Sequence, residues 1–241
     1  MDLSFFSILG FAFIPVATSI LGAIVATFRP PGPIVRSFIQ HLAAGVVFSV
    51  VAVELLPDIV SESGRAALFE VAVGFSLGVA SMLGMRYFSH TLERNGDKRP
   101  LGILFGVGVD VLLDGFLISI SFAAGGGAGL LLTLALAVEM LSLGLAVAVA
   151  LGKSGEQRTV IIISTSLLFL LIVVGAGIGT VILQYIPPAV METVLSFGLA
   201  ALLFLVTEEL LVEAHEEPES PAATGMFFAG FLLFLLLGMF E

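Results

Sequence analysis

The sequence predicts an all-α, polytopic membrane protein that forms a single domain with eight transmembrane helices. Hydrophobic residues make up 59% of the 241 residues, well above the roughly 45–50% found in globular domains. Charged residues make up 12%, about half of the usual share, and the mean hydropathy is +1.17. Apolar stretches of about 20 residues, long enough to cross ~30 Å of hydrocarbon, recur along the whole chain.

The apolar stretches are separated by residues that interrupt helices. We expect the spans at 3–28, 36–57, 66–90, 101–123, 129–151, 159–184, 189–213 and 222–240. Proline, glycine and polar residues stand between them, at Pro30–Pro33, Asn95–Pro100, Gly125–Gly127, Pro187–Pro188 and Pro218–Pro221. Because these residues disfavour helix continuation, they mark the turns between spans.

Basic residues are divided unequally between the two sides of these spans. With the N-terminus outside, Arg65 alone is external, and eight basic residues are cytoplasmic: Arg29, Arg36, Arg86, Arg94, Lys98, Arg99, Lys153 and Arg158. Cytoplasmic loops carry such an excess of Lys and Arg. We therefore expect a multi-pass protein of the plasma (inner) membrane with both termini extracytoplasmic. The start Met1-Asp2 has no basic segment, so no cleavable signal is predicted.

The charge balance limits the class of partner. The chain has 9 Lys and Arg against 19 Asp and Glu, for a net charge of −10, which disfavours nucleic acid and suits a cationic substrate. It has no cysteine, so a disulfide or a thiolate metal site is excluded.

Three acidic residues lie near the middle of predicted spans. Asp110 and Asp114 in the fourth span share a helix face because they are four residues apart, and Glu139 lies in the fifth span. A charge at mid-membrane costs at least ~2.5–3.5 kcal/mol on insertion scales, and no Lys or Arg stands mid-span to pair with these acids. With the Ser142 hydroxyl they predict an oxygen-rich cation site. Protonated acids that are hydrogen-bonded to neighbouring helices remain the alternative.

Further polar residues flank this predicted centre and indicate a cation pathway. The residues assigned to it are Glu54 and Asp58 near the outer mouth, and His41, Glu208, Glu209, Glu213 and His215 near the inner mouth. A lone histidine such as His41 also serves as a core hydrogen-bonding residue, although imidazole suits transition metals. The Glu-Leu-Leu string at Glu54 recurs at Glu209 in a span of opposite direction, which indicates an inverted repeat typical of transporters.

Span two contains the strings HLAAG (41–45) and ELLPD (54–58), and span seven contains EELLVEAH (208–215). Together these strings resemble those of the ZIP family of divalent-metal transporters. It covers nearly the whole chain and includes the eight-span count with both ends outside. It implies an elevator carrier in which spans one, four, five and six hold the metal. The other four spans would form the scaffold of a homodimer.

Spans four and five depart from the family's metal motifs, His-Asn-x-Pro-Glu-Gly and His-Glu-x-Pro-Glu-Gly. Anchoring on Asp114-Gly115 puts Asp110 at one histidine position, and anchoring on Gly144 puts Glu139 at the other. A second register, in which Ser142 occupies the second acid position, stays open. In either register the histidines of the family motifs are absent, and in the first register carboxylates stand at their positions. Carboxylates in place of imidazoles favour a harder ion such as manganese over zinc or iron. Because Val111 and Leu143 stand where the family has further ligands, a single bound metal is expected.

The sequence thus predicts a carrier that moves zinc, iron or manganese into the cytoplasm, with the lipid bilayer and the divalent metal as its partners. No cofactor and no enzymatic activity are expected, and no P-loop for ATP is present. One alternative is a proton-coupled carrier of another solute that uses the acids as a relay. A weaker alternative is an intramembrane aspartyl protease, whose two aspartates come from different helices, whereas Asp110 and Asp114 share one.

Overall fold

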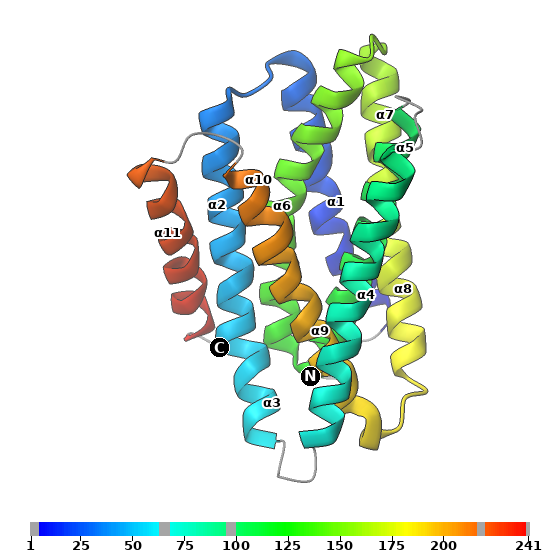
Figure 1. Ribbon diagram of the computed structural model, residues 1–241, viewed down its shortest axis with the longest axis vertical. Helices are drawn as coiled ribbons and strands as arrows, with labels where there is room; N and C mark the ends of the chain where they lie inside the picture. Colours follow the sequence, from blue (N-terminus) through cyan, green and yellow to red (C-terminus); the bar gives the residue numbers. More distant parts are fainter. Residues whose placement is uncertain (1–4, 63–67, 95–99, 216–219, 240–241) are drawn as a thin grey trace.

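The computed structural model describes residues 5–62, 68–94, 100–215 and 220–239, and nearly all of them are helical (Figure 1). In chain order the elements are α1 (Phe5–Phe28), α2 (Pro33–Val50), η1 (Val51–Leu55), α3 (Leu56–Glu62), α4 (Leu68–Arg94), α5 (Pro100–Ala124), α6 (Gly126–Lys153), α7 (Arg158–Phe169), α8 (Leu171–Leu183), α9 (Pro188–Phe204), η3 (Leu205–Leu210), α10 (Leu211–Ala214) and α11 (Pro221–Gly238). Within the described residues, eight helical runs are long and apolar enough to cross a membrane. The predicted all-α polytopic fold is confirmed.

Three of the eight runs are interrupted, although the sequence pattern predicts continuous helices. The run at 158–183 breaks at Leu170 into α7 and α8. Four residues earlier, the Ser166 hydroxyl donates a hydrogen bond to the Ile162 carbonyl at 2.7 Å, an arrangement that bends helices. The runs at 33–62 and 188–214 each contain a π-helical segment, η1 and η3. Such segments are rare and are frequent at functional sites.

Four helix pairs build most of the bundle: α1 with α6, α5 with α8, α2 with α11, and α4 with α9. Each pair crosses at glycines that bring the two backbones into contact, as small residues do in membrane bundles. In the first two crossings, a Cβ on the glycine would collide with a carbonyl oxygen of the partner helix. These contacts are Gly22 with Leu141, Gly144 with Ser19, Gly175 with Leu112, and Gly115 with Ile172.

The register of these contacts reveals an inverted repeat. On each of these four helices, the residue whose carbonyl meets the partner's glycine lies three positions before the helix's own crossing glycine. In α1 and α6 the two residues are Ser19 before Gly22 and Leu141 before Gly144, and in α5 and α8 they are Leu112 before Gly115 and Ile172 before Gly175. These registers allow α1 to be matched with α8 and α6 with α5, and we use this assignment because it keeps the same chain order in both halves, with α1 before α2 and α8 before α9. Figure 1 shows that the members of each corresponding pair run in opposite directions.

The other two crossings extend the repeat. Gly78 of α4 contacts the carbonyl of Phe197, twelve residues before Glu209, and Gly230 of α11 contacts the carbonyl of Leu42, twelve residues before Glu54. The helix α4 thus corresponds to α11, and α2 to α9. The two Glu-Leu-Leu strings fall on the same local structure, because Glu54 lies in η1 and Glu209 lies in η3.

The two ends of the bundle differ in charge. We call one the basic end, because the described basic residues belong to helix segments that lie towards it: Arg29, Arg36, Arg86, Arg94, Lys153 and Arg158. The last turns of α1 and α6 and the first turns of α2 and α7 lie there, at the top of Figure 1. The other end, where α3 and the start of α4 lie, is the opposite end.

Candidate metal centre

Helices α5 and α6 bring three acidic side chains to one point inside the bundle. Asp110 and Asp114 lie one turn apart on α5, and Glu139 comes from the adjacent α6. One carboxylate oxygen from each of the three can be chosen so that all lie within 4.8 Å of one another. Asp114 and Glu139 are only 2% and 3% exposed, and Asp110 is half-buried. Oxygens at this spacing can coordinate one cation.

Two oxygens of this cluster lack a hydrogen-bond donor. Asp114 Oδ2 and Glu139 Oε2 are buried and have no partner among the described residues. Buried polar atoms in folded proteins nearly always have a hydrogen-bond partner, and a buried polar atom without such a bond lowers stability. A cation or a proton would satisfy these oxygens. Carboxylate oxygens are the ligands that Mg²⁺, Ca²⁺ and Mn²⁺ prefer.

A small pocket adjoins the cluster. Its volume is about 30 Å³, and its lining includes Asp110, Glu139, Ser142, Glu209 and Glu213. A cavity needs roughly 10–15 Å³ to hold one water molecule, so the pocket has room for a single ion or water. The hydroxyl-bearing residue Ser142 lines this pocket, as its spacing from Glu139 predicts.

The seventh span contributes to the centre, which the sequence reasoning missed. Glu209 and Glu213 were expected near the inner mouth, but both line the pocket beside Glu139. The carboxyl groups of Asp110 and Glu209 lie close enough to share a hydrogen bond. Because a carboxylate can only accept, such a bond forms only when one of the two groups carries a proton. The available signal was the spacing of four residues between Glu209 and Glu213, which matches that of Asp110 and Asp114.

A larger cavity connects the centre with the basic end. It has a volume of about 390 Å³, and Val107, Asp110, Glu209 and Val212 are among its lining residues. The helix α5 starts at the basic end, and Val107 precedes Asp110 by almost one turn. The cavity therefore extends from the acids towards the basic end.

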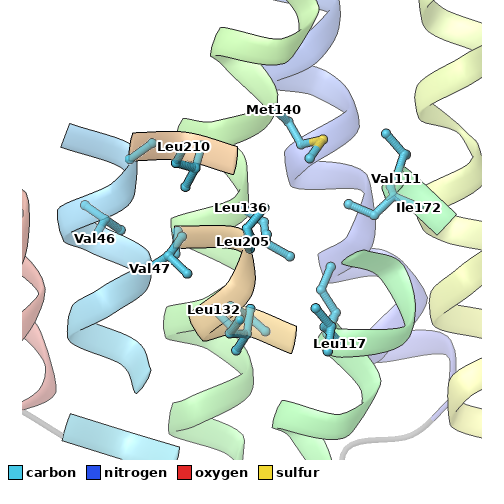
Figure 2. Close-up of a cluster of buried hydrophobic side chains, with 14 of the residues drawn as sticks. Val46, Val47, Val111, Leu117, Leu132, Leu136, Met140, Ile172, Leu205 and Leu210 are labelled. Carbon is cyan, nitrogen blue, oxygen red and sulfur yellow. The ribbon is translucent and has the colours of Figure 1, made fainter. Parts of the chain in front are cut away.

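On the other side of the acids the bundle is tightly packed. Leu117, Leu132, Leu136 and Leu205 are each at most 3% exposed, and they belong to one buried hydrophobic cluster, to which α5, α6 and η3 contribute them (Figure 2). We call these four residues the apolar seal. Leu136 precedes Glu139 by almost one turn on a helix that starts at the opposite end. The seal therefore lies between the acids and that end.

Arg86 of α4 lines the larger cavity together with Asp110. Its guanidinium forms an ion pair with Glu208 of η3, and the two side chains are 39% and 44% exposed. The sequence reasoning found no basic residue in the middle of a span and placed Arg86 at the cytoplasmic boundary. It missed that this long side chain reaches the cavity beside the acids.

The predicted pathway residues His41 and His215 meet near the basic end. Their rings make an edge-to-face contact with centroids 5.2 Å apart. His41 is 3% exposed, and its Nδ1 lies 2.8 Å from the Ser37 carbonyl oxygen. The neighbouring Gln40 donates from Nε2 to a carboxylate oxygen of Glu213. This part of α2 thus holds the end of span seven in place, a role that the sequence did not reveal for Gln40.

Glu54 and Asp58 lie apart from the central acids. Glu54 follows His41 by thirteen residues along one helical run, which corresponds to about 20 Å at 1.5 Å per residue. A Cβ built on Gly238 would lie 2.9 Å from Glu54 Oε1, so this carboxyl group lies against the last turn of α11. Both residues remain pathway candidates at the opposite end.

Comparison with known proteins does not assign this centre. No protein-family model matches the chain, and no curated protein matches it. The similarity to the ZIP family therefore stays a prediction from the motifs, and the site is interpreted from its own chemistry.

Proposed function

We propose that the chain transports a divalent metal cation across a membrane, with Asp110, Asp114 and Glu139 as the central ligands. One observation carries this proposal: three acids in the bundle core place oxygens within 4.8 Å of one another, and two of their oxygens lack a donor. Intramembrane acids without a basic partner are rare and mark ion pathways or proton relays. On the motifs alone, we also propose that the chain is an atypical member of the ZIP family.

Two features support transport by alternating access towards the cytoplasm. The cavity of about 390 Å³ extends from Asp110 towards the basic end, which the positive-inside rule assigns to the cytoplasm. The apolar seal closes the other side of the acids. An inverted repeat lets a transporter exchange two such states, because each half can adopt the conformation of the other.

The ligand set bears on which metal is carried. The residues that line the small pocket offer carboxylate and hydroxyl oxygens, which suit manganese better than the softer, imidazole-preferring zinc. The motifs of spans two and seven suggest zinc or iron by their similarity to the ZIP family. We favour manganese among these three because the ligands act directly on the ion.

Uptake of Mn²⁺, Fe²⁺ and Zn²⁺ into proteoliposomes tests the proposal. Asp110→Asn and Glu139→Gln each remove one charge from the centre and keep the side-chain shape. Each should lower uptake at least about tenfold, since a lost charged ligand interaction is worth roughly 1.5–3 kcal/mol. Glu156→Gln is the matched control, because Glu156 is exposed in the turn between α6 and α7. Unchanged uptake in both centre variants would contradict the assignment.

A second candidate is a proton-coupled carrier of another solute. The proximity of the carboxyl groups of Asp110 and Glu209 favours it, because two carboxyl groups can share a proton through a hydrogen bond. The two candidates differ in whether proton flux across the membrane requires a divalent metal. Proton flux that needs a divalent metal supports the first candidate, and flux in metal-free proteoliposomes supports the second.

A further inference from the structure

Arg86 places a permanent positive charge in the cavity through which the proposed ion would leave. Arginine stays protonated at all physiological pH values. Its guanidinium pairs with Glu208, and the residue lines the same cavity as Asp110 and Glu209. Because both partners are more than one-third exposed, the pair is solvated and can open at little cost.

The inverted repeat shows what occupies the equivalent position at the opposite end. Arg86 follows Gly78 by eight residues on α4, and Gly238 follows Gly230 by eight residues on α11. Gly78 and Gly230 occupy matching crossings with Phe197 and Leu42. Gly238 is therefore the counterpart of Arg86.

The surroundings of Gly238 confirm this correspondence. A Cβ on Gly238 would lie 2.9 Å from Glu54 Oε1 and 3.5 Å from Val53 Cγ1. Val53 and Glu54 are the counterparts of Glu208 and Glu209, which lie beside Arg86. One half of the repeat thus carries an arginine–glutamate pair where the other half carries a glycine and a valine.

We propose that Arg86 is a tethered cation that competes with the transported metal for the acids of the cavity and so promotes release at the basic end. This inference rests on the proposed function. A guanidinium repels a divalent cation and attracts the carboxylates Glu208 and Glu209, so it weakens the hold of the cavity on the metal. The counterpart Gly238 has no side chain, so this position supplies no such competing charge in the other half of the repeat.

The test measures Mn²⁺ binding by calorimetry on the purified full chain, together with Mn²⁺ uptake into proteoliposomes. Arg86→Met removes the charge and keeps an apolar chain. Arg86→Gln removes the charge and keeps an amide donor for Glu208, which makes it the gentler variant. Arg86→Lys keeps the charge. Arg158→Met is the matched control, because Arg158 also lies at the basic end but its guanidinium stacks 5.3 Å from the Phe28 ring centroid.

Both neutral variants should bind Mn²⁺ about tenfold more tightly than the parent, a change of about 1.4 kcal/mol. They should also show a lower KM and a lower maximal uptake rate, because release becomes slower. Arg86→Lys should restore most of the parent's Mn²⁺ affinity because it keeps the charge, and Arg158→Met should match the parent. Loss of a merely structural contact does not tighten binding, so the sign of the change is diagnostic.

The outcomes separate the two proposals. If the parent binds Mn²⁺ but Arg86→Gln binds it equally or more weakly, the role of Arg86 is wrong and the transport proposal stands. If neither the parent nor any variant binds Mn²⁺, Fe²⁺ or Zn²⁺, the transport proposal itself fails, and the role of Arg86 fails with it.

Discussion

The segment around η3 and α10 and the segment around η1 and α3 share a sequence string and a local structure, yet their surroundings differ. At η3, Glu209 lies beside Asp110, an arginine and a cavity of about 390 Å³. At η1, Glu54 lies against the last turn of α11. Between Glu54 and the central acids lies the apolar seal. The Glu-Leu-Leu string alone therefore does not create a binding environment.

What differs between the two segments is how the neighbouring helices are packed and which residue lies at one equivalent position. The crossings of α1 with α6 and of α5 with α8 have matching registers, so the framework of the two halves is the same. The two halves therefore differ in the open cavity beside η3 and in Arg86, whose counterpart in the other half is Gly238.

The largest effect is expected from filling the glycine crossings. A Cβ at Gly144 or Gly115 would collide with the carbonyl oxygen of Ser19 or Ile172. Overpacking costs ~1–3 kcal/mol and occasionally more, so Gly144→Ala and Gly115→Ala should both strongly lower the thermal unfolding temperature in detergent. Gly10→Ala is the control, because no atom lies within 4 Å of its Cβ position. It should raise stability by up to about 1 kcal/mol, as alanine does in a helix. A loss of stability in only one of the two crossings would break the equivalence of the halves.

The next effect concerns access from the two ends. Val107 lines the open cavity, and its counterpart Leu136 is fully buried. The native chain has no cysteine, so Val107→Cys and Leu136→Cys each introduce a single reactive thiol. With a water-soluble thiol reagent at the basic end, Leu136→Cys should react on the order of a hundredfold more slowly than Val107→Cys, because buried thiols are inert. Equal rates would mean that the seal is not closed on this side.

A smaller effect is expected from the two glutamates of the repeated string. Glu209→Gln removes a charge that adjoins Asp110 and should weaken Mn²⁺ binding about tenfold, in line with charged hydrogen bonds worth roughly 1.5–3 kcal/mol. Glu54→Gln alters the counterpart that lies behind the seal and should change the Mn²⁺ affinity less than about twofold. Equal losses in the two variants would show that both strings contact the metal in one state.

The smallest effect concerns metal preference. The double variant Asp110→His with Glu139→His replaces two of the three carboxylates by imidazoles. It should raise the affinity for Zn²⁺ relative to Mn²⁺ several-fold, because imidazole suits zinc. Competition binding of the two metals to the purified double variant measures this ratio. A ratio equal to that of the parent would mean that ligand hardness does not set selectivity at this centre.

The sequence predicts the fold class well because its signals are local. Apolar length and the breaks at proline and glycine define the eight spans, and the spacing of Asp110 and Asp114 follows from one helix. The approach of Glu209 to Asp110 and the reach of Arg86 depend on how distant helices pack, which no local pattern specifies. The π-helical turn at η3 and the break at Leu170 were equally hidden, since neither proline nor glycine lies at them. At η1 the signal was Pro57, which removes the backbone N–H that would bond the Val53 carbonyl.

The pairing of the helices has a consequence for how the protein is made. Gly45 of α2 contacts the backbone of Phe227 of α11, yet α11 starts 171 residues after α2 ends at Val50. At about 5–20 residues per second, α2 waits roughly 10–35 s on the ribosome-bound chain before its partner is synthesised. During that time its buried polar residues, Gln40 and His41, lack the contacts that they make with Glu213 and His215. Until α11 is made, α2 can pack only on earlier helices such as α6, so its place in the bundle is completed only when translation is nearly over.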